Sequence, residues 1–152
     1  MMLPRTILVS IDLDGLATRV LDYAVELAAC VGAKLHVVHA VARPVHDAEV
    51  PEAMVRASLD EVVARARAAL EPVVGAHHAA GHLASVSVEL GEPVGVILAA
   101  AEARHAELII TGTHGRQGVS RLFLGSVAEQ IARRAPCPVT LIRHLPADRA
   151  SP

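Results

Sequence analysis

The chain has 152 residues, of which 53% are hydrophobic, and its formal net charge at pH 7 is −2. This length suits one domain, and so small a charge argues against the basic surface that nucleic acids or anionic membranes attract. With one Tyr, one Phe and no Trp, the chain also lacks the aromatic platform on which single-stranded nucleic acids stack.

Apolar runs alternate with helical periodicity along the chain. In order, we predict a strand over residues 6–12, a helix over 15–31, a strand over 34–41, a helix over 51–74, a strand over 85–90, a helix after Glu92-Pro93, a strand over 106–112, a helix from Gly125-Ser126 and a strand over 139–143. Asp14 is suited to cap the first helix. This alternation, with right-handed crossovers, predicts an α/β fold: a single-domain, doubly wound, five-stranded parallel sheet with helices on both faces.

The glycine-rich connection after the fourth predicted strand is the most informative segment. It reads Gly112-Thr113-His114-Gly115, then nine residues, then Gly125-Ser126 at the start of a helix. Unpaired amides and the positive dipole end of that helix attract an anion, and glycines let phosphate oxygens approach the backbone. No Gly-Lys-Ser/Thr ends the segment and no Gly-x-Gly-x-x-Gly follows the first strand, so two other phosphate-binding classes fit poorly.

In these features the chain resembles the ATP-binding branch of the universal stress protein family, whose signature is Gly-x-x-Gly, nine residues, then Gly with Ser or Thr. The resemblance extends from the Ile7 to Asp12 run through Gly91-Glu92-Pro93 to the segment 135–139. It implies a Rossmann-like sheet of order 3-2-1-4-5, with the ends of the first and fourth strands side by side.

The resemblance also implies which residues hold the nucleotide. They are Asp12, Val41, Gly112, His114, Gly115, Arg116, Gly125, Ser126 and Val127. A carboxylate at Asp12 can accept hydrogen bonds from a ribose hydroxyl or an adenine amino group, whereas Asp14 is better placed as the helix cap. The family commonly continues Asp-Gly-Ser, but this chain reads Asp12-Leu13-Asp14, and the extra negative charge bears on triphosphate affinity and metal binding. For Val41, a strand-end packing role is equally consistent with the sequence.

The expected ligand is ATP, with or without Mg²⁺, and the expected function is that of a nucleotide-dependent stress-response regulator. No nucleophile, base and orienting group occur in a recognised arrangement, so we predict binding rather than rapid catalysis. The alternatives are a slow ATPase or autophosphorylating enzyme, for which Ser120, Ser126 and His114 supply some parts, and an interaction module that binds no nucleotide.

We predict a nucleotide-binding domain over residues 1–146 and a loose tail over 147–152. The last strand is an expected sheet edge, and the resemblance suggests that it pairs with its own copy in a homodimer, alongside an unknown regulatory protein partner. Cys30 and Cys137 form no disulfide or zinc pattern, and the sequence begins with no signal peptide, so a cytoplasmic location is expected.

Two groups of histidines are candidate metal ligands. His36 and His39 lie at an odd separation on one predicted strand and therefore point to opposite faces. His77, His78 and His82 are dense, but no nearby Cys or carboxylate in the sequence completes a set, and a solvated helix end or loop explains them better. The sequence therefore predicts no metal site.

Overall fold

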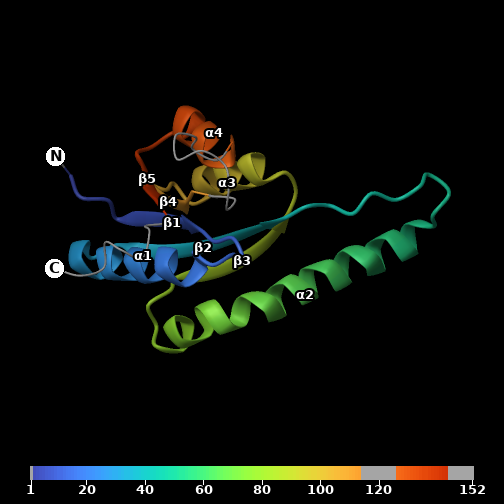
Figure 1. Ribbon diagram of the computed structural model, residues 1–152, viewed down its shortest axis with the longest axis horizontal. Helices are drawn as coiled ribbons and strands as arrows, with labels where there is room; N and C mark the ends of the chain where they lie inside the picture. The colour runs from blue at the N-terminus through green and yellow to red at the C-terminus, as the bar shows by residue number, and fades with distance from the viewer. Residues whose placement is uncertain (1, 114–125, 144–152) are drawn as a thin grey trace.

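The computed structural model describes residues 2–113 and 126–143, which form one five-stranded sheet in the order β3-β2-β1-β4-β5 (Figure 1). All neighbouring strands are parallel. The elements are β1 (Thr6–Ser10), α1 (Ala17–Val31), β2 (Lys34–Val41), α2 (Glu52–Ala79), β3 (Ser85–Leu90), α3 (Pro93–Ala103), β4 (Leu108–Gly112), α4 (Ser126–Arg134) and β5 (Val139–Ile142). The predicted fold class and strand order are confirmed.

Helices cover both faces of the sheet, with α1 and α2 on one side and α3 and α4 on the other (Figure 1). Successive residues of a strand point to opposite faces, so one strand contributes to two cores. Ile7 and Val9 of β1 pack with the α1 and α2 side, whereas Leu8 packs with the α3 and α4 side. The central strand is therefore continuously apolar, as a strand buried on both faces must be.

Several predicted boundaries differ from the observed ones by a few residues. β1 ends at Ser10 rather than at residue 12, and β4 begins at Leu108 rather than at 106. Ladder partners on neighbouring strands decide where a strand ends, and an apolar run does not reveal them. The early end of β1 leaves Asp12 in a connecting segment beyond the sheet edge.

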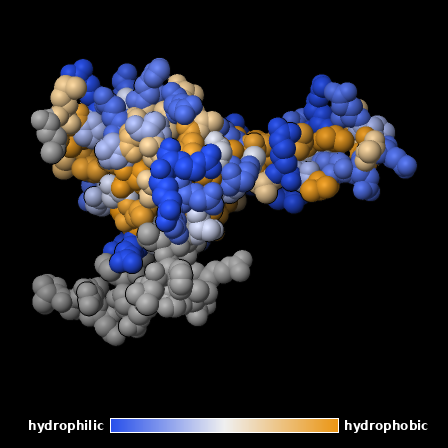
Figure 2. Space-filling view, turned by 90° about the horizontal axis from the view of Figure 1, so that it is seen from above, coloured by the Kyte–Doolittle hydropathy of each residue, from blue (hydrophilic) through white to orange (hydrophobic). Residues whose placement is uncertain are grey.

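Helix α2 is much longer than the strands beside it. It has 28 residues, or about 42 Å at 1.5 Å per residue, whereas the 6 residues of β3 span about 20 Å. Its amino-terminal half therefore projects beyond the sheet together with the segment 42–51 (Figure 1), and Figure 2 shows this arm as a mixture of apolar and polar side chains. Leu70 and Val74 are buried, whereas Leu59 and Val62, nearer the amino end of the helix, are only half-buried.

The turn into α3 is fixed by Glu92. Its carboxylate accepts hydrogen bonds from the amides of Val94 at 3.0 Å and Gly95 at 2.9 Å. These two bonds, with Gly95 the larger cause, lower the pKa of the Glu92 carboxyl below its ordinary value. Glu92 thus satisfies amides that the first turn of a helix leaves without a partner.

In the part of the chain that the structure describes, no helix has both the length and the apolar character needed to span a lipid bilayer.

Candidate functional site

The carboxyl ends of β1 and β4 lie side by side. The two strands pair in parallel, and Ser10 is the register partner of Thr111. Half-buried Asp12 follows two residues after the last residue of β1, and Gly112 and Thr113 follow Thr111 on β4. The expected proximity of these two strand ends is confirmed, and it creates the switch point at which parallel α/β sheets bind ligands.

The backbone before Asp12 is held by β2. The Ile11 amide donates to the Val38 carbonyl at 3.0 Å, and the buried His39 ring donates from Nδ1 to the Ile11 carbonyl at 2.6 Å. Because a carbonyl only accepts, this contact assigns the hydrogen to Nδ1 of His39. Both backbone groups of Ile11 are therefore engaged, which fixes the direction in which the chain reaches Asp12.

Sequence reasoning missed this role of His39, which it considered only as a metal ligand. The signal was the alternation along β2, because Leu35 and Val37 share the face of His39 and are buried. A polar residue at the next position of a buried row needs a hydrogen-bond partner, and the end of the neighbouring strand supplies one.

The two acidic residues after β1 have different surroundings. The Asp14 carboxylate accepts a hydrogen bond from the Leu16 amide at 2.9 Å, and the Asp14 carbonyl accepts one from the Ala17 amide at 3.2 Å. Asp14 therefore holds the turn that precedes α1, but the helix begins at Ala17, later than predicted. Its N-cap is Leu16 and has no side-chain cap hydrogen bond, so the predicted capping by Asp14 is wrong. The predicted ligand contact of Asp12 stays a prediction.

Gly112 has a packing reason for lacking a side chain. A Cβ at this position would lie 3.2 Å from Val20 Cγ2 and 3.8 Å from Leu16 Cδ1, both on the side of α1. The glycine thus lets the end of β4 approach the start of α1. Its predicted contact with phosphate stays a prediction.

The far side of the predicted glycine loop begins at α4. Ser126 is exposed as the first residue of this helix, whereas Val127 is half-buried and packs on the α3 and α4 core. On the near side, the Thr113 amide donates to the Ile142 carbonyl at 2.8 Å and ties the end of β4 to β5. The site residues His114, Gly115, Arg116 and Gly125 lie outside the described residues.

Val41, the predicted adenine neighbour, ends β2 at the same edge of the sheet. Its side chain is half-buried against the α1 and α2 core, and its carbonyl accepts a hydrogen bond from the Gly91 amide at 2.8 Å. The carbonyl oxygen retains a second lone pair for a ligand. Both roles considered for this residue are compatible with that geometry.

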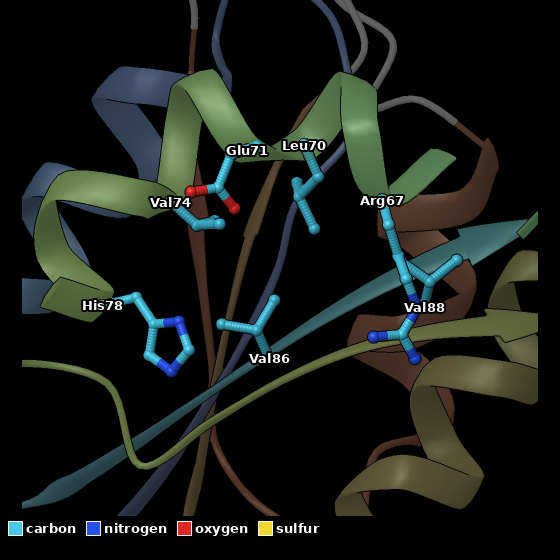
Figure 3. A pocket seen from close by; sticks show the side chains of 7 residues that line it. All are labelled: Arg67, Leu70, Glu71, Val74, His78, Val86 and Val88. Carbon is cyan, nitrogen blue, oxygen red and sulfur yellow. The ribbon is translucent and has the colours of Figure 1, made fainter. Parts of the chain in front are cut away.

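Two hollows lie outside this region. One, of about 260 Å³, opens between α2 and β3 over an apolar floor with charged groups at its rim (Figure 3). Its lining residues are Arg67, Leu70, Glu71, Val74, His78, Val86 and Val88. The other, of about 310 Å³, is lined by Arg19, Tyr23, Leu141, Ile142 and Arg143 between α1 and β5. Asp12, Gly112 and Ser126 line neither hollow.

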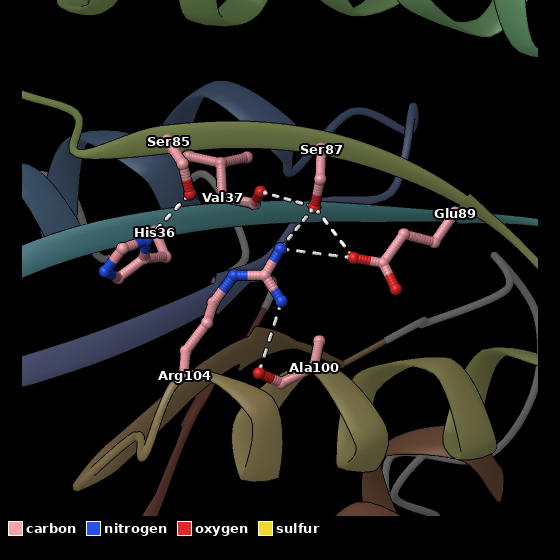
Figure 4. Close-up of polar contacts among 7 residues, drawn as sticks. All are labelled: His36, Val37, Ser85, Ser87, Glu89, Ala100 and Arg104. Atoms are coloured by element: carbon pink, nitrogen blue, oxygen red, sulfur yellow. Dashed lines mark hydrogen bonds and ion pairs between the residues drawn. The ribbon is translucent and has the colours of Figure 1, made fainter.

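A cluster of polar side chains lies between β3 and α3 (Figure 4). His36 Nδ1 lies 2.7 Å from Ser85 Oγ. Burial, and then the positive charges of Arg104 and Lys34, lower the pKa of His36. Among the described residues no carboxylate is hydrogen-bonded to this ring, so the pair lacks the orienting group of a nucleophile triad.

Arg104 gives this cluster a structural role, because it links α3 to β3 through hydrogen bonds. Its guanidinium donates to Ser87 Oγ at 3.1 Å, to Glu89 Oε1 at 3.2 Å and to the Ala100 carbonyl at 3.3 Å (Figure 4). These bonds join the end of α3 to the polar face of β3. The cluster therefore fastens a helix to an edge strand and offers no free nucleophile.

Comparison with known proteins agrees with this architecture. The universal stress protein family model matches residues 4–143. A universal stress protein of Thermus aquaticus, described as lying in a QAH/OAS sulfhydrylase 3' region, is 34% identical over 141 residues, covering 91% of this chain and 98% of that protein.

Two solved structures extend the comparison. UspA from Lactobacillus plantarum superposes with a TM-score of 0.74 at 24% identity, over 91% of this chain and 97% of that one. A universal stress protein in complex with cAMP gives a TM-score of 0.57 at 25% identity, over 92% and 97%. From the family match and the Thermus relative together, the chain belongs to the universal stress protein family.

Proposed function

We propose that the chain binds an adenine nucleotide, with ATP as the preferred ligand, across the carboxyl ends of β1 and β4. The observation that carries this proposal is the parallel pairing of β1 with β4, which brings the segment that leads to Asp12 and the Gly112 end of β4 to the same edge of the sheet, in a chain with the complete glycine signature. A family member in complex with cAMP supports an adenine nucleotide as the ligand class.

The residues present suit the chemistry of such a ligand. Asp12 supplies acceptor oxygens for a ribose or an adenine amino group. Ser126 is exposed at the amino end of α4, where the first amides of a helix and its dipole favour phosphate. His114, Gly115, Arg116 and Gly125 enter from the sequence signature as further phosphate contacts. A Mg²⁺ ion accompanying the triphosphate would offset part of the negative charge near Asp12 and Asp14.

Titration of the purified chain with ATP, ADP, cAMP, GTP and NAD tests the proposal directly. We expect ATP to bind most tightly and Gly115→Val to abolish binding, because an added side chain blocks the approach of phosphate to the backbone. Asp12→Asn should weaken binding, whereas the matched change Asp60→Asn, on exposed α2, should leave it unaltered. Absence of adenylate binding at millimolar concentration, or equal affinity in the wild type and Gly115→Val, would refute the proposal.

The regulatory part of the proposal is that nucleotide occupancy alters the surface formed by residues 113–124, which a partner protein then reads. Such regulation requires two conformations of the chain, and ATP shifts the equilibrium between them only if it binds one conformation more tightly than the other. We also propose a cytoplasmic setting, consistent with Cys30 and Cys137 being free thiols. Affinity capture with ATP-loaded and nucleotide-free protein should recover different partners, and identical sets would contradict regulation by occupancy.

We further propose that the protein is a homodimer paired through β5. This strand ends the sheet at Val139–Ile142, next to β4, and all four of its residues are half-buried. An edge strand of this kind presents unpaired backbone groups to a second copy. A two-fold axis across it gives a self-complementary interface, the commonest arrangement in soluble oligomers.

A further inference from the structure

Two histidines meet where α2 ends, at the amino edge of the sheet and far from the proposed nucleotide site. His77 lies in the last turn of α2, and His82 lies in the turn that leads to β3. Their Nδ1 atoms are 3.2 Å apart. On its other side, His77 Nε2 lies 3.0 Å from Asp22 Oδ1 of α1. The carboxylate that the sequence did not place near these histidines thus comes from another helix.

The backbone holds the two histidines together. The His82 amide donates to the His77 carbonyl at 3.0 Å, the Gly81 amide donates to the His78 carbonyl at 3.0 Å, and Gly81 has a φ of 75°. This is the hydrogen-bond pattern of a Schellman motif, in which a glycine ends the helix and the residue after it contacts the last turn. An apolar contact frequently occupies that place, but here two imidazoles do. The helix end therefore brings the two residues together, and the contact with Asp22 orients the His77 ring.

The surrounding partners determine which nitrogen carries a proton. Asp22 only accepts when ionised, so His77 Nε2 carries the hydrogen of this contact. In a neutral ring, His77 Nδ1 then presents a lone pair toward His82 Nδ1. Either a hydrogen on His82 or a metal ion can occupy the space between the two nitrogens. A carboxylate behind a histidine is the usual outer partner of a histidine metal ligand.

We infer that His77 and His82 bind a divalent transition metal ion through their Nδ1 atoms, with Asp22 orienting His77. A separation of 3.2 Å is one that an ion with Zn–N bonds of about 2.0–2.1 Å can bridge. Imidazole nitrogen selects Zn²⁺, Cu²⁺ or Ni²⁺ over Mg²⁺ and Ca²⁺, which prefer oxygen. The described residues include no group of three or more metal-ligating side chains, so water completes the coordination.

The site is open enough for an ion to enter, since the His77 side chain is 25% exposed and that of Asp22 is 53% exposed. Adjacent His78 points instead into the hollow between α2 and β3, beside Val86 (Figure 3). It therefore belongs to a different face of the helix and serves as a matched control.

Calorimetric titration of the full chain, prepared without a histidine tag, tests the inference with Zn²⁺, Cu²⁺, Ni²⁺ and Mg²⁺. We expect one transition metal ion per chain, Cu²⁺ bound more tightly than Ni²⁺ or Zn²⁺, and no Mg²⁺ in the absence of nucleotide. His77→Ala and His82→Ala should abolish binding. Asp22→Asn should weaken it about 10- to 100-fold, as loss of an outer partner does, and His78→Ala should change nothing.

Imidazole nitrogen chemical shifts of the wild-type chain provide a second measurement that needs no variant. On addition of Zn²⁺, the Nδ1 resonances of His77 and His82 should move while those of His36 and His39 stay in place. Shifts confined to other histidines, equal loss of affinity in His78→Ala and His77→Ala, or no binding of any of the three ions would overturn the inference. Both measurements are made without ATP, so their outcome does not depend on whether the proposed nucleotide site exists.

Discussion

Among individual residues, His39 has the clearest testable consequence. In His39→Leu the buried Ile11 carbonyl loses its hydrogen bond to the ring, and an unsatisfied buried acceptor costs about 1–3 kcal/mol. We expect the free energy of unfolding, measured with urea, to fall by that amount. The control is His36→Leu on the opposite face of β2, whose half-buried partner Ser85 can turn to water. Equal losses in the two variants would contradict a special role for His39.

Glu92 gives a prediction for pH dependence. Its pKa is lowered in the folded chain by the amides of Gly95 and Val94, so the unfolded chain binds the proton more readily. The stabilisation is therefore complete above the ordinary pKa of 4.5 and is lost as pH falls through the lower folded value. Glu92→Gln should be less stable than the wild type at pH 7, and the difference should shrink on acidification. Urea denaturation across this range measures it, and a difference independent of pH would exclude the effect.

At the scale of single residues, the sequence was better at indicating which residues matter than at predicting what each of them contacts. Asp12 was expected beside the end of β4; the strand pairing, which runs through Ser10 and Thr111, brings the two strand ends together, and the role of Asp12 there stays a prediction. Gly112 was interpreted as an opening for phosphate, whereas the structure also shows it accommodating Val20 of α1. That contact joins residues far apart in the chain, so no local pattern could reveal it. His39 and Asp22 acquire their partners in the same long-range way.

For the elements, the unequal burial of α2 can be measured. Leu70 is 1% exposed in its carboxyl-terminal half, whereas Leu59 is half-buried in the projecting arm. Leu70→Ala should cost about 2–5 kcal/mol of unfolding free energy, and Leu59→Ala about 1 kcal/mol or less. Thermal and urea denaturation of the two matched variants tests this. Equal costs would mean that the arm is buried in the native assembly.

The end of α2 shows where local rules fail. The helix was predicted to stop at residue 74, but it continues to Ala79 and includes Pro72 and Gly75, which are both poor helix formers. Burial of Leu70 and Val74 against the sheet outweighs those propensities. By contrast, β2 and β3 match their predicted limits.

For the whole molecule, strand and helix alternation predicted the parallel sheet, and the last strand, β5, lies at an edge of the sheet as expected. The order of the strands came from the family resemblance, since alternation alone permits several orders. The glycine loop itself could be recognised only in the sequence, because most of its residues lie outside those that the structure describes.

If the chain dimerises through β5, proline substitutions at two neighbouring positions of this strand should have different effects, one on the dimer and the other on the fold. The carbonyls of Pro138 and Ile142 accept bonds from β4, so backbone groups of alternate residues, including Leu141, point to the free edge. Leu141→Pro removes an outward amide and should convert a dimer to a monomer with the fold retained. Thr140→Pro removes an amide on the β4 side and should destabilise the fold. Light scattering and circular dichroism measure both. A monomeric wild type would rule out the pairing.

The two edge strands of the sheet, β3 and β5, differ in charge, and this difference limits how many chains can associate edge to edge. On β3, Glu89 forms an ion pair with Arg104 at 3.2 Å, and α2 packs alongside, whereas β5 ends the opposite side with no comparable charge among its residues. Partly buried charge discourages further strand addition. The proposed two-fold pairing at β5 would occupy that edge in both copies and leave only the charged β3 edges exposed. Growth would then terminate at two chains and would not continue into a filament.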